Sequence, residues 1–263
     1  MNILIIGCCT EEFCNFIKQS KHVNKIYTAS QSPLENIANI DYSNIEELCK
    51  KAKALNIDYA ILTDKNHIKY GINEIFKKHR INLISANQKW FYLEASRIVA
   101  KQLVTHYSIN TPAILKTPLS FPVILKTDEP KYNITVNSMQ ELISQKEKLG
   151  NLRTFIEEYC DGEVFEILSL WDGKTLLMFP PQNLTEVQED SLNLYRTNLN
   201  NLLYNENANF VGFFISRLIW AKHNWYLQEF KMELNEKLAM ENIKKDFVYL
   251  ITSAIYQKLY EIN

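Results

Sequence analysis

The chain has the sequence FIEEYCDGEVFEILSLWDGKTLLMFPPQ at residues 155–182, and this stretch does most to decide its fold. It opens with a short apolar strand that carries adjacent acids at Glu157 and Glu158. After Gly162, two apolar runs of strand length flank a Trp-Asp-Gly-Lys turn, and a Pro-Pro pair ends the second run. Apolar runs separated by a short turn containing glycine predict a β-hairpin. The stretch therefore predicts a strand with acidic side chains followed by a buried hairpin.

The first hundred residues alternate between strand and helix patterns. An apolar run typical of a strand occurs at residues 2–6, another buried-type strand pattern at 59–62, and short strand patterns at 25–29 and 82–85. Amphipathic spacing predicts helices at residues 11–20, 45–55, 72–79 and 88–106. Because strands that alternate with helices form parallel βαβ units, this part predicts an α/β domain with a doubly wound parallel sheet.

The rest of the chain favours an α+β arrangement. Strand patterns occur at residues 121–126, 133–136, 154–159, 164–171, 175–179, 210–219 and 225–230. Helices are expected at residues 138–149, where Ser138 and Glu141 have capping-box spacing, and at 247–260, whereas residues 185–205 are polar and rich in asparagine. We therefore expect domains at residues 1–100 and 101–240, the second with a subdomain at about 118–182 and a remainder at about 205–240, and a C-terminal helix within 241–263.

Composition and charge limit the classes of function. The 263 residues carry a formal net charge of −1, which gives no electrostatic case for a nucleic-acid or membrane partner. No apolar run approaches the roughly 18–20 residues that span a bilayer. Five cysteines without a secretory leader predict reduced thiols and a cytoplasmic location. Cys8, Cys9 and Cys14 lack zinc spacing, so we expect Cys8 and Cys9 to pack beside the first strand.

Three segments together resemble one known family. Residues 155–182 resemble the nucleotide-binding stretch of phosphoribosylamine–glycine ligases, which are ATP-grasp enzymes of purine biosynthesis. Residues 93–101, LEASRIVAK, are similar to that family's Leu-Glu-Gly-Ser-Lys-x-x-x-Lys helix, and residues 121–126, FPVILK, to the strand with its second ATP lysine. The resemblance implies that Lys101 and Lys126 contact ATP phosphates. It also implies that the first domain is of the pre-ATP-grasp type and the second an ATP-grasp domain.

The resemblance implies further contacts to the nucleotide. The family's adenine-contacting hinge, where backbone groups hold the base, falls on Glu157, Glu158 and Tyr159. Glu163 matches the family's Gly-Glu pair, but the ribose-binding acid that follows it is replaced by valine here. Glu163 or Glu166 would therefore have to take over the ribose contact.

The metal position is retained only in part. Residues 228–231, QEFK, resemble the family's metal-binding Leu-Glu-Phe-Asn, which implies Glu229 as a magnesium ligand. Lys231 stands where the family has asparagine, so an oxygen ligand is missing and an ammonium opposes the metal charge. We therefore expect Lys231 to form an ion pair with Glu229. ATP and magnesium are the cofactors implied, and this substitution counts against the metal.

Other segments depart from the family pattern. Residues 6–13, IGCCTEEF, replace Ile-Gly-x-Gly-Gly-Arg-Glu-His, so a substrate phosphate would meet side chains and acids there. Residues 127–133, TDEPKYN, lack the glycines of a flexible loop that closes over the triphosphate, and residues 183–205 lack those of a Gly/Asp/Asn-rich loop. In residues 63–68, TDKNHI, Lys65 replaces an acid. The family's C-terminal domain is expected to be absent after residue 240.

Two functions from different classes compete. The first is a divergent ligase-like protein with lost or reduced activity, which binds a nucleotide or an unknown protein partner or acts as a structural protein. The second is an active ATP-dependent carboxylate–amine ligase that forms an acyl phosphate. A dinucleotide-binding oxidoreductase is disfavoured because no G-x-G-x-x-G follows the first strand. The altered phosphate, loop and metal positions favour the first function, and no catalytic residue is assigned.

Overall fold

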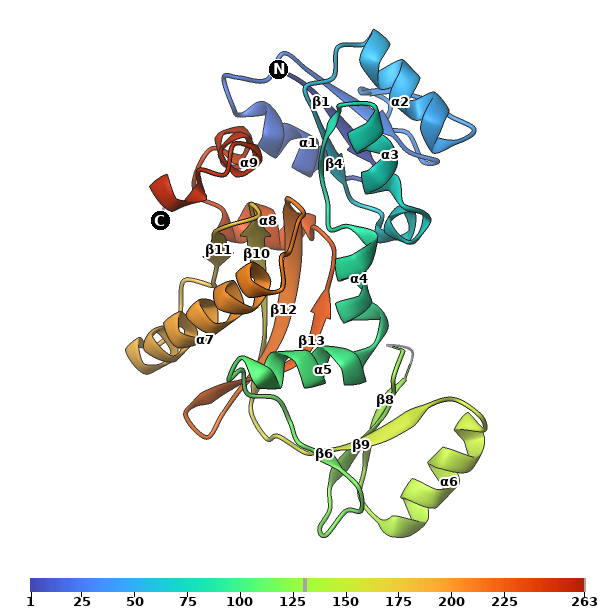
Figure 1. Cartoon of the computed structure of the whole chain (residues 1–263), viewed down its shortest axis with the longest axis vertical. Coiled ribbons are helices and arrows are strands. Elements are labelled where there is room, and N and C mark those ends of the chain that lie inside the picture. Colours follow the sequence, from blue (N-terminus) through green and yellow to red (C-terminus); the bar gives the residue numbers. More distant parts are fainter. Residues whose placement is uncertain (130–131, 263) are drawn as a thin grey trace.

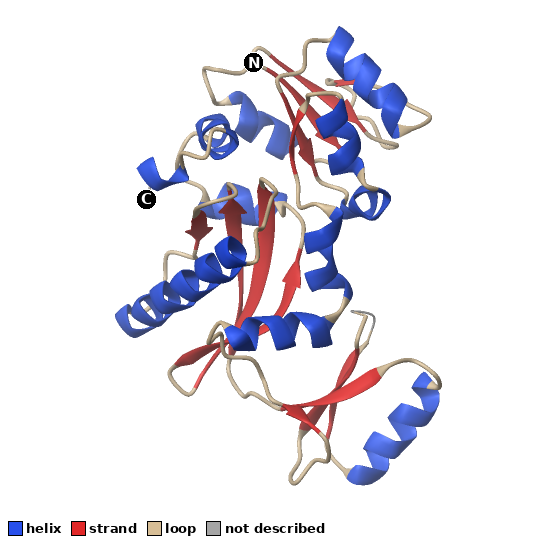
Figure 2. Ribbon diagram, in the orientation of Figure 1, coloured by secondary structure: helices blue, strands red, loops and turns tan. Residues whose placement is uncertain are grey.

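The computed structural model describes residues 1–129 and 132–262. Three sheets follow one another along its long axis, with a parallel sheet at one end and a small antiparallel sheet at the other (Figure 1). A second antiparallel sheet lies between them, and helices cover the sheets (Figure 2).

The N-terminal sheet is parallel, as the alternating pattern predicted, and has the strand order β3-β2-β1-β4-β5. Its strands are β1 (Asn2–Ile6), β2 (Lys25–Ala29), β3 (Ala38–Asn39), β4 (Tyr59–Leu62) and β5 (Asn82–Ile84). Helices α1 (Glu11–Lys18), α2 (Ile45–Ala54) and α3 (Ile72–Lys78) connect them, with a 3-10 turn, η1 (Lys65–Tyr70), before α3. The expected α/β domain is therefore confirmed.

The central strand β1 divides its side chains between two cores. Leu4 and Ile6 belong to the core that α2 and α3 cover, whereas Ile3 and Ile5 belong to the core that α1 covers. Successive strand residues point to opposite faces, so a continuous apolar strand needs helices on both sides. This is why β1 is apolar at every position from Ile3 to Ile6.

The predicted long helix at residues 88–106 is two helices, α4 (Gln88–Ala95) and α5 (Arg97–His106). Ser96 separates them with extended backbone angles (φ −130°, ψ 108°), and its hydroxyl oxygen accepts a hydrogen bond from the N–H of Val99. Asp128 accepts hydrogen bonds from the Ser96 hydroxyl and from the N–H of Ile98. These partners satisfy the start of α5, so the chain can turn without leaving buried donors unpaired.

The small sheet has the order β6-β9-β7-β8 and is antiparallel. It contains β6 (Ile114–Leu115), β7 (Val123–Thr127), β8 (Asn133–Val136) and β9 (Thr154–Glu158), and α6 (Met139–Leu149) packs on it. Ser138 caps α6 as predicted by accepting from the N–H of Glu141, but the Glu141 side chain accepts from the N–H of Asn137 instead of Ser138. The predicted box is thus half formed.

The larger antiparallel sheet has the order β11-β10-β12-β13. Its strands are β10 (Glu163–Trp171), β11 (Leu176–Phe179), β12 (Gly212–Ala221) and β13 (Asn224–Lys231). The hairpin predicted from residues 155–182 is present, but it pairs with β12 rather than with the small sheet. The small sheet therefore ends at Glu158, earlier than the expected subdomain boundary near residue 182.

The asparagine-rich segment forms α7 (Glu186–Asn205), a helix of 20 residues that the sequence pattern did not predict. Thr185 and Gln188 form a reciprocal capping box at its start. Leu192, Leu199 and Leu202 are buried along one face, where they join the core beneath the large sheet. The polar residues occupy the outer face and obscured this period.

The C-terminal segment contains α8 (Glu236–Asn242), α9 (Phe247–Ile255) and a short turn, η2 (Leu259–Glu261). The predicted helix at 247–260 therefore stops at Ile255. Phe247 packs edge-on against Phe13 of α1, with ring centroids 5.6 Å apart, so α9 covers the α1 face of the parallel sheet. Within the part of the chain that the structure describes, no helix is both long and apolar enough to cross a membrane.

Candidate functional site

The two lysines that the resemblance assigns to ATP phosphates meet at one carboxylate. Lys101 of α5 lies 2.9 Å from one oxygen of Glu157, and Lys126 of β7 lies 2.8 Å from the other. Glu157 on β9 pairs with Ile124 on β7, so Glu157 and Lys126 are diagonal neighbours on one face of the small sheet. The structure thus brings Lys101, Lys126 and Glu157 together as a buried triad.

The triad carries a net positive charge in a desolvated place. The side chains of Lys101, Lys126 and Glu157 are 5%, 3% and 1% exposed. Burial lowers the pKa of Lys101, and the neighbouring Glu157 carboxylate only partly opposes this effect. Lys101 also donates a hydrogen bond to the carbonyl of Pro112 at 3.3 Å. Two ammonium groups around one carboxylate leave a surplus that an anion would satisfy.

The other predicted nucleotide contacts lie at the end of β9 and the start of β10. Glu158, next to the triad, accepts a hydrogen bond from the N–H of Ala113, and its own N–H donates to the carbonyl of the same residue. Tyr159 is exposed just after β9. Glu163 is exposed at the start of β10 and pairs with Trp220 in the register. Their proposed contacts to adenine and ribose stay predictions.

The predicted metal ligand Glu229 is bound by an arginine. The guanidinium of Arg97, the first residue of α5, donates two hydrogen bonds to one Glu229 oxygen, at 2.6 and 3.0 Å. Arg217 lies 3.9 Å from the other oxygen. Burial on its own raises the pKa of Glu229, but the charge and hydrogen bonds of Arg97 outweigh it, so the pKa is lowered.

Arg97 also joins three elements of the site. Its remaining guanidinium nitrogen donates to the backbone carbonyls of Thr127 and Tyr132, which flank the segment after β7. The sequence pattern predicted no role for this residue, although it lies within the 93–101 motif. A basic residue four positions before Lys101 is the signal that could have drawn attention to it.

The ion pair expected between Lys231 and Glu229 is absent from the described contacts, and this prediction was wrong. Lys231 instead lies 2.5 Å from Glu166 on β10. The Glu229 carboxylate is already paired with Arg97, whereas the long Lys231 side chain can reach across β12 to Glu166. Glu166 is thereby engaged in an ion pair, at a position considered for the ribose contact.

These residues do not fit a magnesium ion. Magnesium prefers carboxylate oxygens and water, but one oxygen of the retained carboxylate is bound by the Arg97 guanidinium and the other lies 3.9 Å from Arg217. The second ligand position is a lysine in an ion pair. Among the described residues, no group of three or more His, Cys, Asp or Glu side chains is arranged to hold a metal.

The segment that replaces the family's glycine loop is anchored at its start. Asp128 is 8% exposed; one of its oxygens accepts from Ser96 and Ile98, and the other lies 3.1 Å from Arg153. The N–H of Arg97 donates to the Asp128 carbonyl. Residues 130 and 131, at the middle of this segment, lie outside the described residues. Both the side chain and the backbone carbonyl of Asp128 therefore accept hydrogen bonds from the start of α5.

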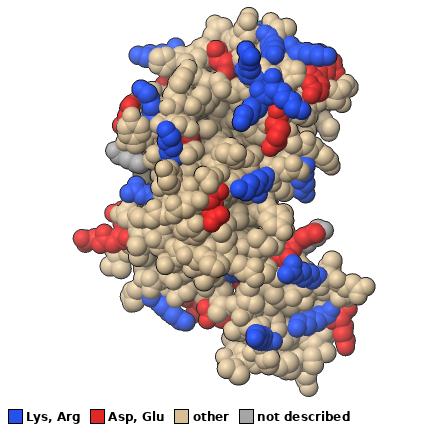
Figure 3. Space-filling view, viewed as in Figure 1, with Lys and Arg blue, Asp and Glu red and all other residues tan. Residues whose placement is uncertain are grey.

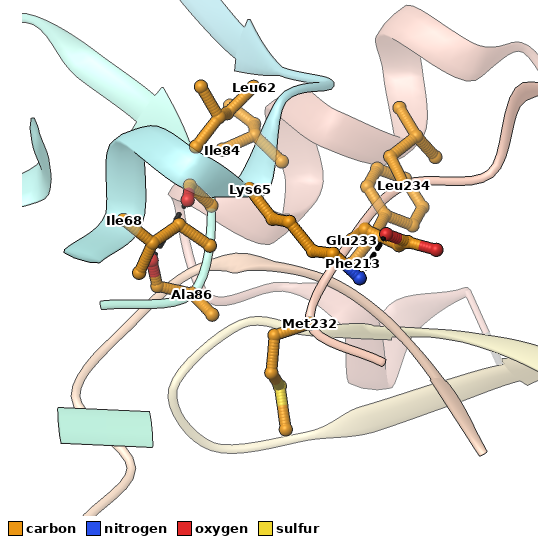
Figure 4. Close-up of a pocket in the computed structure, with 10 residues that line it drawn as sticks. Leu62, Lys65, Ile68, Ile84, Ala86, Phe213, Met232, Glu233 and Leu234 are labelled. Carbon is orange, nitrogen blue, oxygen red and sulfur yellow. Dashed lines mark hydrogen bonds and ion pairs between the residues drawn. The ribbon is translucent and has the colours of Figure 1, made fainter. Parts of the chain in front are cut away.

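A second ion cluster joins the parallel sheet to the end of β13. Lys65 of η1 lies 2.5 Å from Glu94 and 2.9 Å from Glu233, and Figure 4 shows it extending toward Glu233. Burial lowers the pKa of Lys65, but the two carboxylates outweigh it, so the pKa is raised. Glu94 also accepts from the N–H of Met232 at 2.7 Å. The cavity beside Lys65 measures about 10 Å³, room for one water at most.

No family model matches the chain. Its curated relatives include the phosphoribosylamine–glycine ligases of Fusobacterium nucleatum, 22% identical over all of this chain and 75% of that protein, and of Clostridium acetobutylicum, 23% identical over all of this chain and 77% of that protein. This chain is a divergent relative of the phosphoribosylamine–glycine ligases. It spans about three quarters of the length of these two relatives.

The structural comparisons agree with this family relationship. The phosphoribosylamine–glycine ligase of Thermotoga maritima superposes with a TM-score of 0.73 at 16% identity, over 98% of this chain and 76% of that one. D-alanine–D-alanine ligase of Bacillus anthracis, in a complex with ATP, gives a TM-score of 0.63 at 18% identity over 99% of both chains. The fold is therefore an α/β domain followed by an ATP-grasp domain, as predicted.

Proposed function

We propose that this ligase relative is a binding or structural protein of the ATP-grasp fold whose magnesium-dependent ligase activity is lost or strongly reduced. The observation that carries the proposal is the pair between Arg97 and Glu229. An acyl-phosphate reaction needs a cation on the ATP phosphates at the moment of transfer. Here the guanidinium of Arg97 is hydrogen-bonded to Glu229, the carboxylate that would hold that cation.

The energetics make displacement of Arg97 unfavourable. Its side chain is 7% exposed and that of Glu229 is 15% exposed, so both charges are largely removed from water. Breaking a buried pair by removing one partner costs about 3–5 kcal/mol, because the other charge remains buried. A magnesium ion would also meet Lys126 and Arg217, whose charges act on the same carboxylate.

The buried triad supports a nucleotide as one partner. Lys101 and Lys126 retain the positions that the resemblance assigns to phosphate contacts, and they meet within 3 Å of one carboxylate. A groove of about 640 Å³, lined by Lys101, Thr105 and Tyr226 among others, opens beside α5. Grooves of this volume accept ligands of nucleotide size.

The buried triad of Lys101, Lys126 and Glu157 also favours a second candidate function, an active ATP-dependent carboxylate–amine ligase of the phosphoribosylamine–glycine type. Both ATP lysines are present, and their surplus charge would suit a phosphate. In that case ATP would phosphorylate a carboxylate, and an amine would capture the acyl phosphate. The cation on the phosphates would then need ligands other than an arginine-bound Glu229.

Calorimetric titration with ATP, in magnesium and in a chelator, separates the two functions. Under the proposal, magnesium leaves the ATP affinity unchanged within about twofold, or ATP does not bind. Glu229→Ala is the test variant and Glu241→Ala, at an exposed acid of α8, is its matched control. Micromolar binding that needs magnesium and disappears only in Glu229→Ala would support the active ligase.

Turnover is then measured directly as phosphate release with glycine and phosphoribosylamine. The proposal predicts no release above the level of a Lys126→Ala variant, which removes one of the two lysines. Release that depends on both substrates and on Lys126 would establish the ligase instead.

We also propose a cytoplasmic location without nucleic-acid or membrane partners. The five cysteines are free thiols, which suits a reducing compartment. Charges of both signs are interspersed over the visible face of the molecule rather than gathered into one basic surface (Figure 3). Fractionation of cells followed by immunodetection tests the location; recovery with the membrane or chromatin fraction would contradict it.

A further inference from the structure

Two cysteines meet where the chain passes from β1 into α1. The sulfur atoms of Cys9 and Cys14 lie 3.6 Å apart and share a hydrogen bond that either thiol can donate. Thr10 is the N-cap of α1, since its side chain accepts from the N–H of Phe13. Cys9 therefore precedes the cap, and Cys14 is the fourth residue of the helix. Side chains at these two positions regularly pack together at helix starts, so local geometry brings the thiols together.

The segment that carries Cys9 is held in place from its other side. The N–H and the hydroxyl of Thr10 both donate to one oxygen of Glu236, the first residue of α8, at 3.0 and 2.7 Å. Cys14 is fully buried beside Phe13 and Ile17, whereas Cys9 is half-buried and therefore reachable from solvent. One thiol is accessible, and the other is fixed behind it.

The remaining cysteines have different surroundings. Cys8 is exposed, and its sulfur lies 3.9 Å from the hydroxyl of Ser30. Cys49 is fully buried in the α2 core, and Cys160 lies beside Glu158. Among the residues that the structure describes, Cys9 and Cys14 are the two cysteines whose thiols are in contact.

We propose that Cys9 and Cys14 form a redox-active dithiol site, which low-molecular-weight disulfides oxidise to an intramolecular disulfide. The Cys9 thiolate attacks a disulfide R–S–S–R, forming a Cys9–S–S–R bond and releasing one thiolate RS⁻. The Cys14 thiolate then attacks the Cys9 sulfur, forming the Cys9–Cys14 bond and releasing the second RS⁻. Two electrons pass from the cysteine thiols to the disulfide, and the two protons end on the released thiols.

The contact between the two sulfur atoms supports both steps. Cys14 can donate a hydrogen bond to a thiolate on the accessible Cys9, and once Cys14 loses its own proton to solvent it already lies 3.6 Å from the Cys9 sulfur that it attacks. The site lies in the turn where the family's phosphate-binding glycines are replaced. Its chemistry does not depend on the nucleotide site, so its test is independent of the proposed function.

The experiment exposes the full-length protein to excess oxidised glutathione, blocks the remaining thiols with N-ethylmaleimide and maps the peptides by mass spectrometry after trypsin digestion. Cys8, Cys9 and Cys14 share the tryptic peptide that ends at Lys18. In the native protein, we expect this peptide to carry one blocked thiol, at Cys8, and a disulfide between Cys9 and Cys14. Cys49 should stay reduced.

Two variants locate the bond. Cys8→Ser should keep the Cys9–Cys14 disulfide, and Cys14→Ser should stop at a mixed disulfide between Cys9 and glutathione. Because the wild-type protein is mapped as well, a variant that fails to fold does not decide the outcome. A wild-type peptide with three blocked thiols, a disulfide that includes Cys8, or an intramolecular disulfide that survives in Cys14→Ser would each overturn the proposal.

Discussion

Replacing Glu157 by glutamine tests the buried triad most sharply, because the change keeps the shape and removes the charge. Lys101 and Lys126 would then remain in a place where their side chains are 5% and 3% exposed, without the carboxylate at 2.9 and 2.8 Å. Removing one partner from a buried ion pair destabilises a protein by about 3–5 kcal/mol. We therefore expect Glu157→Gln to lower the free energy of unfolding by about that amount at neutral pH.

The pH dependence of the stability deficit provides a second test of this prediction. The folded-state pKa of Lys101 is already lowered by burial, so protonated Lys101 opposes folding, and stability recovers as the pH rises through that lowered pKa. Without Glu157 the lowering should increase, since the carboxylate is what opposes it. The stability deficit of Glu157→Gln should therefore shrink between neutral pH and about pH 9.5, below the unfolded pKa of lysine.

Urea unfolding followed by circular dichroism measures both effects. Glu158→Gln is the matched control, because Glu158 lies next in the chain and accepts hydrogen bonds from the N–H of Ala113 and the thiol of Cys160. The glutamine oxygen can still accept, so this variant should change the stability by no more than about 1 kcal/mol. Equal midpoints for the two variants, or a Glu157→Gln deficit that grows as the pH rises, would refute the reasoning.

Two further substitutions test the other ion pairs. Arg97→Gln should destabilise the protein by about 3–5 kcal/mol at neutral pH, measured by urea unfolding, because Glu229 is left buried without its partner. The folded pKa of Glu229 should then rise, so the deficit should shrink on acidification, and a deficit that is the same at neutral pH and near pH 5 would contradict this. Lys65→Met should also destabilise, because it leaves Glu94, 8% exposed, without its ammonium, and adding Glu94→Gln should recover part of the loss. Thermal unfolding of the single and double variants measures this coupling, and strictly additive losses would count against a direct pair.

The alternation of apolar strands and amphipathic helices was enough to predict the parallel sheet. β1, β2 and β4 have the predicted bounds because each is a short, mostly apolar strand pattern followed by a polar residue or glycine. The break at Ser96 could not be predicted in this way. It depends on Asp128, 32 positions along the chain, which accepts from the Ser96 hydroxyl and the N–H of Ile98.

The candidate site was predictable in its residues and less so in its pairing. Lys101, Lys126 and Glu157 were identified from three separate motifs, and the structure places them together. The partner of Glu229 was not predictable: the basic Arg97 within the 93–101 motif could have drawn attention to itself, but it lies 132 positions from Glu229 and nothing local indicates their pairing. Lys231 looked like the partner since it shares a strand with Glu229, but the two side chains compete with neighbours on other strands.

The most direct test of the central claim is the magnesium dependence of ATP binding, measured as the ratio of dissociation constants in magnesium and in chelator by calorimetry. The claim is that Arg97 takes the place of the metal at Glu229. It predicts a ratio within about twofold of one, or no binding in either buffer, and the same result in Glu229→Ala. ATP binding that is at least about tenfold tighter in magnesium, and that loses this difference in Glu229→Ala, would contradict it.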